Sequence, residues 1–194
     1  MAFLGTIAAL SLTVDPVSTL TPGFAKAVFH RSDLLAGNLV GAFGAGAVLA
    51  ALTVAGRRAD ATRHLPVTCL ALGGGMLAFA LAPGLAWAYP ALVVAGAGYL
   101  MTNTVATTAV QLEVEDAHRG RLMALWSIAF LGIRPVGSLV DGGMAQAAGL
   151  RAGGVVMSLP VMAAAIALVW FARRTSRTAE AVAEAVEADP LWSR

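Results

Sequence analysis

Long apolar stretches separated by short polar turns constrain this chain more than any other feature. Each stretch is about 17 to 25 residues long, the helix length that crosses a hydrocarbon core of roughly 30 Å at about 1.5 Å per residue. Of the 194 residues, 58% are hydrophobic and 12% are charged, whereas soluble domains carry about 25% charged residues. A water-soluble fold cannot bury so much apolar surface, so the sequence predicts an all-α membrane protein.

The apolar stretches predict six transmembrane helices in one domain that covers residues 1–174. The spans are expected at about 2–20, 34–55, 66–81, 86–110, 122–147 and 153–172. The first stretch has the length of a signal peptide, but no Lys or Arg precedes it, so we expect a mature spanning helix. Residues 175–194 form a polar tail, in which 178–188 fit either a short helix outside the membrane or a solvated, partly disordered segment.

The basic residues predict the orientation, because cytoplasmic loops are enriched in Lys and Arg. If the N-terminus is cytoplasmic, three basic residues lie outside: Lys26, Arg31 and Arg151. The cytoplasmic side then holds eight: Arg57, Arg58, Arg63, Arg119, Arg121, Arg173, Arg174 and Arg177. We therefore expect a multi-pass protein of the plasma membrane, the inner membrane of the cell, with both termini cytoplasmic.

Motifs of soluble enzymes are missing from the sequence, including G-x-S-x-G, H-E-x-x-H and the phosphate-binding G-x-x-x-x-G-K-[ST]. The three histidines, His30, His64 and His118, fall in predicted loops on both sides of the membrane, and Cys69 is the only cysteine. We therefore expect no enzymatic activity, no metal and no cofactor. The net charge of +2 comes from short basic clusters between apolar runs, which argues against a nucleic-acid partner.

A polar stripe on the fourth stretch is the most informative candidate site. Polar side chains recur there every four residues, with two more beside them: Tyr99, Asn103, Thr107 and Gln111, flanked by Thr104 and Thr108. Such a face is costly in lipid, so it should meet water or other helices. It can line a substrate path, or it can form hydrogen bonds between helices.

Ionisable residues inside the predicted spans are the second candidate site. Arg134 lies about twelve residues into the fifth stretch, roughly 18 Å deep at about 1.5 Å per residue. An Arg at that depth costs about 2.5 to 3.5 kcal/mol and should point inward to an anion, carbonyl groups or water. Asp15 and Asp141 are its candidate partners, and Asp141 is expected close to the outer interface. Arg134 and Asp15 can take part in substrate or proton coupling, or they can form a static ion pair.

Small residues on the second stretch predict close packing with another helix. The glycines are Gly37, Gly41, Gly44 and Gly46.

The order of these motifs resembles the C-terminal half of a major facilitator superfamily transporter. The matching runs are Gly41 to Gly46 (G-A-F-G-A-G), Arg119 to Met123 (R-G-R-L-M) and Phe130 to Ser138 (F-L-G-I-R-P-V-G-S). The resemblance covers about residues 2–174 and is closest to the drug and siderophore efflux branch, which includes enterobactin-exporter-like and macrolide-efflux-like proteins.

The resemblance implies helices seven to twelve of a twelve-helix transporter, with alternating access driven by an ion gradient. It implies that the first and fourth stretches line the cavity and that the second and fifth form gating contacts. The cytoplasmic latch of the family would involve Arg57, Arg58, Asp60, Arg63, Arg119 and Arg121. The family often has D-R-x-G-R-R in this loop, whereas Asp60 is followed here by Ala61, Thr62, Arg63 and His64.

The sequence therefore predicts secondary active transport, with proton-coupled efflux of small molecules by the C-terminal half of a transporter. The expected partners are the lipid bilayer, a small-molecule substrate, and an N-terminal six-helix half or a second copy of the chain. The alternative is a truncated or remnant membrane protein with a packing or assembly role and no transport of its own.

Overall fold

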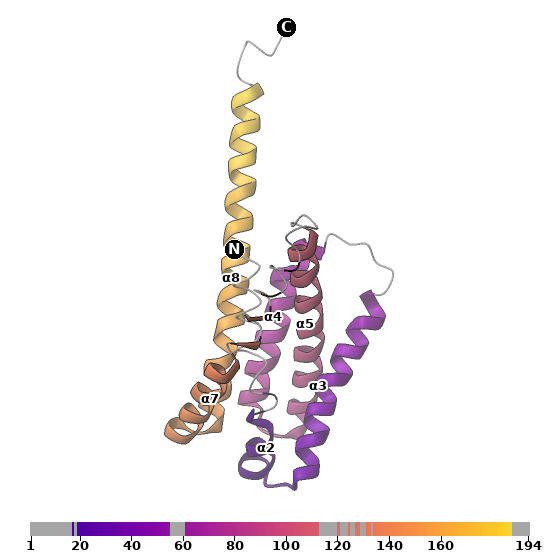
Figure 1. Ribbon diagram of the computed structural model, residues 1–194, viewed down its shortest axis with the longest axis vertical. Helices are drawn as coiled ribbons and strands as arrows, with labels where there is room; N and C mark the ends of the chain where they lie inside the picture. The colour runs from indigo at the N-terminus through magenta and orange to yellow at the C-terminus, as the bar shows by residue number, and fades with distance from the viewer. Residues whose placement is uncertain are drawn as a thin grey trace.

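The protein is an elongated bundle of helices in a computed structural model (Figure 1). The structure describes residues 19–54, 61–112 and 134–187, with isolated positions at 17, 120, 124, 127, 128, 131 and 132. Within these residues the regular elements are all helical. They are α2 (Thr21–Gly23), the π-helix η1 (Phe24–Val28), α3 (Asp33–Val54), α4 (Ala61–Leu81), α5 (Leu85–Leu112), α7 (Arg134–Ala148) and α8 (Leu150–Glu187).

Four of the described helices are long and apolar enough to cross a membrane. The apolar segments are Leu34–Thr53 in α3, His64–Leu81 in α4, Leu85–Thr108 in α5 and Leu150–Trp170 in α8. Large apolar side chains such as Leu34, Val48 and Leu52 are more than half exposed, as expected of helices whose solvent is lipid. The described part of the chain therefore belongs to a multi-pass membrane protein. Most of the expected span at 2–20 lies outside the described residues, as do several positions between 122 and 133 in the expected span at 122–147.

The helices pack in a defined spatial order, in which α5 lies between α3 and α4, and α4 lies between α5 and α8 (Figure 1). Glycines allow the backbones to approach closely at these contacts. A Cβ atom on Gly96 of α5 would collide with the carbonyl oxygen of Phe43, and one on Gly46 of α3 would collide with that of Val93. A Cβ atom on Gly75 of α4 would lie 2.7 Å from the backbone nitrogen of Ala95.

The first expected span ends later than the sequence indicates. The expected spans at 2–20 and 34–55 leave residues 21–33 as a connection, but α2 and η1 continue the helical path to Val28. Burial explains the difference, because Phe24 and Ala25 are enclosed and the Phe24 ring lies 4.8 Å from that of Phe79 in α4. The turn comes at His30, whose φ of 51° is left-handed.

The fifth expected span is interrupted just before its middle. Residues 124, 127, 128 and 131 are helical, Gly132 forms a turn, and α7 begins at Arg134. Pro135 then occupies the first turn of α7, where its missing N–H leaves no hydrogen bond unmade. Arg134 therefore lies at the start of a helix rather than in the middle of a continuous one.

The last helix is longer than the expected span of 153–172. At about 1.5 Å per residue, its 38 residues reach roughly 57 Å, nearly twice the hydrocarbon thickness. Figure 1 shows α8 projecting far beyond the ends of the other helices. Residues 175–187 of the polar tail are thus a continuation of α8 rather than a separate short helix or a solvated coil.

Arg151, near the start of α8, joins that end of the bundle to α4. Its guanidinium donates hydrogen bonds to the carbonyl oxygens of Ala80 at 3.2 Å and Ala82 at 2.9 Å. The last carbonyl groups of a helix have no partner within the helix and form the negative end of its dipole. Arg151 therefore supplies hydrogen bonds to carbonyl groups at the C-terminal end of α4.

Candidate transport site

The polar stripe lies on α5, and its members differ in their surroundings. The ring of Tyr99 packs against that of Phe43 in α3, with centroids 5.6 Å apart. Asn103 and Thr107 are partly buried, and Asn103 Oδ1 and Thr107 Oγ1 are enclosed with no hydrogen-bond partner among the described residues. Thr104 and Thr108 are exposed, and the side chain of Gln111 lies outside the described residues.

Thr102 shows how the same helix satisfies a buried hydroxyl. Its Oγ1 donates to Oγ1 of Thr68 in α4 at 2.9 Å, and Thr68 Oγ1 donates to the carbonyl oxygen of Leu65 at 2.9 Å. Both threonines are buried. This chain of hydrogen bonds joins α5 to α4 and has a structural role.

The enclosed atoms of Asn103 and Thr107 carry an energetic cost that Thr102 does not. A buried polar group left without a hydrogen bond costs about 1 to 3 kcal/mol in proteins. The two residues are four positions apart, so they lie one above the other on one helix face. This face is suited to accept a partner that the described chain does not provide, such as water, a ligand or another part of the transporter.

A buried carboxylate on α7 forms a second polar centre. Asp141 has no exposed surface, and its Oδ2 accepts a hydrogen bond of 3.0 Å from Oγ1 of Thr19. Thr19 is 122 positions away in the sequence, at the end of the first apolar stretch. The side chain is thus packed inside the bundle, and the expected position of Asp141 close to the outer interface stays a prediction.

Tight packing encloses Asp141 on the side of α8. A Cβ atom on Gly153 of α8 would lie 3.4 Å from the backbone oxygen of Asp141 and 3.3 Å from Cδ1 of Leu20. The lack of a side chain at Gly153 thus lets α8 close over this part of α7. The sequence does single out Asp141 as a candidate site residue, since it is the only Asp or Glu between Asp116 and Glu180.

The structure tests little of the expected Arg134 and Asp15 pair. Arg134 is the first residue of α7, and its side chain lies outside the described residues, as does the whole of Asp15. Along α7, Arg134 and Asp141 are seven residues apart, which corresponds to about 10 Å of helix rise. The coupling role of Arg134 and Asp15 stays a prediction.

The expected latch residues lie almost wholly outside the described residues. This applies to Arg57, Arg58, Asp60, Arg119 and Arg121, whereas Arg63 lies in the first turn of α4 with its side chain not described. The four glycines of α3 are all described. Gly46 meets α5, while a Cβ atom on Gly37, Gly41 or Gly44 would meet nothing within 4 Å among the described residues.

Metal-ligating side chains do not gather within the part of the chain that the structure describes. No group of three or more His, Cys, Asp or Glu residues there could hold a metal ion. His30 and His64 are both exposed, and Cys69 is buried in α4.

Several membrane-spanning helices that enclose polar side chains define a class of protein, the polytopic membrane protein. The family comparison agrees and is more specific. Residues 4–192 match the family model described as "transmembrane secretion effector", and the chain belongs to this family of the major facilitator type. Membrane transport is the activity that this membership indicates. None of the curated proteins matches the chain in sequence.

Proposed function

We propose that this chain is one half of a secondary active exporter that moves small molecules across the plasma membrane in exchange for protons. The observation that carries the proposal is the pair of enclosed atoms on α5, Asn103 Oδ1 and Thr107 Oγ1, which have no hydrogen-bond partner in the part of the chain that the structure describes. In a membrane protein such groups favour a water-filled or ligand-filled path, because lipid offers no hydrogen bond. The other members of the stripe, Tyr99, Thr104, Thr108 and Gln111, would extend this path along α5.

Asp141 is our leading candidate for the proton-binding group. A carboxylate inside a membrane is costly when charged and commonly marks a proton or substrate pathway. Its hydrogen bond from Thr19 connects α7 to the end of the first apolar stretch, so a change in its protonation would act on two segments at once. Arg134 and Asp15 remain additional candidates from the sequence.

A second half is part of the proposal. The span in α3 is only 28% buried. No described residue lies within 4 Å of a Cβ atom at Gly37, Gly41 or Gly44, so this face would suit an approaching helix. We propose that an N-terminal six-helix unit packs near this face, and that a second copy of the chain is the alternative partner.

We also propose that α8 protrudes on the cytoplasmic side, because Arg173, Arg174 and Arg177 follow its apolar span. The test uses single cysteines in a variant in which buried Cys69 is replaced by Ala. A cysteine at position 177 should react with an impermeant thiol reagent only in inside-out vesicles, and one at exposed position 30 only in right-side-out vesicles. The reverse pattern would overturn the orientation.

The transport test measures efflux from cells that express the natural protein. A panel of fluorescent amphipathic dyes is loaded, and their loss is followed with and without a protonophore. We expect expression to accelerate the loss of at least one dye, and the protonophore to remove the acceleration. Equal loss in expressing and control cells across the panel would instead support a packing or assembly role.

The coupling test replaces Asp141 by Asn, which keeps the shape and the hydrogen bond from Thr19 but cannot bind and release a proton. We expect gradient-driven efflux to be lost, while dye-for-dye exchange, which needs no proton movement, continues. Asp141→Glu is the matched control that should retain part of the coupled efflux. If Asp141→Asn supports full gradient-driven efflux, Asp141 is a structural residue.

A further inference from the structure

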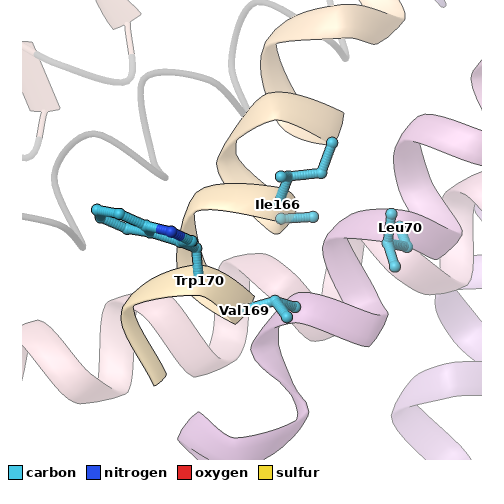
Figure 2. Close-up of a pocket in the computed structure, with 5 residues that line it drawn as sticks. Leu70, Ile166, Val169 and Trp170 are labelled. Carbon is cyan, nitrogen blue, oxygen red and sulfur yellow. The ribbon is translucent and has the colours of Figure 1, made fainter. Parts of the chain in front are cut away.

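A groove between α4 and α8 lies outside the candidate transport site (Figure 2). It is lined by Leu70 of α4 and by Ala165, Ile166, Val169 and Trp170 of α8, and its volume is about 260 Å³. The lining is hydrocarbon apart from the indole of Trp170. Leu70, Ile166 and Trp170 are 43%, 65% and 48% exposed, so the groove opens to the surface of the bundle.

The two helices give similar values for the distance of the groove from the end of their apolar segments. The apolar segment of α8 ends at Trp170, and that of α4 begins at His64. At about 1.5 Å per residue, Ile166 lies roughly 6 Å from one of these limits and Leu70 roughly 9 Å from the other. The two helices run in opposite directions (Figure 1), so both limits lie on the same side of the groove. With these limits at the edge of the hydrocarbon core, the groove would lie in the outer part of one lipid leaflet, where acyl chains begin.

Charge is concentrated directly beyond the groove. Helix α8 continues past Trp170 through positions 173, 174 and 177, all of which are arginine. These positions continue the helical register of Ile166 and Trp170, with steps of three or four residues. No Asp or Glu occurs between Arg151 and Glu180, so no carboxylate of α8 lies between the groove and these three arginines.

We propose that the groove between α4 and α8 binds an anionic phospholipid, with an acyl chain along Leu70, Ile166 and Val169 and the phosphate group beside Arg173, Arg174 and Arg177. Clusters of basic residues next to a membrane helix attract anionic lipid head groups. Trp170 lies at the level of the interface between them, where tryptophan is favoured.

The chemistry of the groove argues against a transported substrate as the occupant. Specific small-molecule sites combine apolar walls with a few placed polar groups and usually have volumes of about 300 to 1,000 Å³. The groove is smaller and has hydrocarbon walls, which suits a slender acyl chain. The positive charge that the sequence places next to the groove, at positions 173, 174 and 177 of α8, would match the charge of a phosphate group.

The test uses Trp170 as the reporter in the full-length protein. The other three tryptophans are replaced by Phe, namely Trp87, Trp126 and Trp192. The protein is reconstituted in equal mixtures of phosphatidylglycerol and phosphatidylcholine, with quenching bromine atoms on the acyl chains of one lipid or the other. We expect the quenching of Trp170 to report a preference of about fivefold or more for phosphatidylglycerol, the effect of at least one arginine near the membrane surface.

Two variants then test the two parts of the site. Substituting R173Q, R174Q and R177Q together should reduce the preference to about one, with little effect on folding because these positions follow the apolar span. Val169→Phe should fill the groove and reduce quenching by both lipids. Leu159→Phe is its matched control, since Leu159 is 52% exposed on α8 and does not line the groove.

Three results would overturn the proposal. One is equal quenching by the two lipids in the otherwise unchanged single-tryptophan protein. Another is a preference that survives the loss of all three arginines. The last is quenching by both lipids that is the same in Val169→Phe as in Leu159→Phe, which would mean that the head group is attracted without an acyl chain in the groove. Elution of each variant as a single species on size-exclusion chromatography controls for misfolding.

Discussion

Thr102 and Asn103 are neighbours on α5, yet they belong to two different kinds of polar surface. Thr102 faces α4 and completes a chain of hydrogen bonds through Thr68 to the carbonyl oxygen of Leu65. Asn103 lies about 100° further around the helix, and its Oδ1 is enclosed without a hydrogen-bond partner from the described helices. The role of a polar residue in a membrane helix therefore depends on the hydrogen bonds that it makes and not on its residue type.

The largest expected effect comes from disrupting the close contact between Gly96 of α5 and the backbone of α3. Gly96→Leu would place a side chain against the backbone of Phe43 in α3, where backbone cannot move aside. We expect a loss of roughly 3 kcal/mol or more, above the usual range for overpacking, seen as aggregation or as a lower midpoint of unfolding in mixed detergent micelles.

Gly44→Leu is the matched control for that change. Gly44 lies next to Phe43 on α3, the helix that Gly96 of α5 contacts, but a Cβ atom on Gly44 would meet nothing within 4 Å among the described residues. The described bundle should therefore keep its stability. The opposite result would be that Gly44→Leu stops transport while Gly96→Leu folds normally. The tightly packed surface of α3 would then be the one at Gly44 and not the one at Phe43.

Thr107→Val is the next largest change, and it is expected to stabilise the protein. Valine has nearly the same shape as threonine but removes the enclosed hydroxyl, whose burial without a partner costs about 1 to 3 kcal/mol. We expect the midpoint of unfolding to rise, and we expect transport to weaken because a substrate or water contact is lost. If one hydrogen bond to the substrate is removed, KM should increase roughly 3-fold to 10-fold, the effect of about 0.5 to 1.5 kcal/mol.

Thr102→Val applies the same substitution five positions earlier and should have the opposite sign. It removes the hydrogen bond to Thr68, and such bonds between membrane helices contribute about 0.6 kcal/mol on average. The midpoint of unfolding in mixed micelles should therefore be slightly lower, with no change in the KM for transport. Equal shifts of the same sign for Thr102→Val and Thr107→Val would remove the distinction between the two faces.

The sequence predicts the helices of this protein better than their contacts, for a physical reason. Lipid requires each spanning segment to satisfy its own backbone, so apolar length alone places α3 near 34–55 and α5 near 86–110. The interruption at Gly132 has a local signal in the following Arg134-Pro135 pair, because proline favours the first turn of a helix.

Side-chain partners are not encoded in the same local way. The burial of Asp141 depends on Thr19, 122 positions away, and on the lack of a side chain at Gly153. The stripe from Tyr99 to Gln111 was predicted from its spacing, but spacing could not tell that Thr102, outside the stripe, is the residue that pairs with α4. That distinction depends on the register of α4 against α5, which only the packed structure provides.

The smallest effect is expected at Thr104, which follows Asn103 but is exposed. Thr104→Val should change the free energy of unfolding by no more than about 0.5 kcal/mol, as is usual for surface positions. If Thr104 lines a water-filled path, its hydroxyl already exchanges hydrogen bonds with water, so its loss should raise KM less than the loss of the enclosed Thr107 hydroxyl does. A larger KM effect at Thr104 than at Thr107 would show that the substrate contacts the exposed flank of α5, and that the unpartnered atoms of Asn103 and Thr107 serve contact with the other half instead.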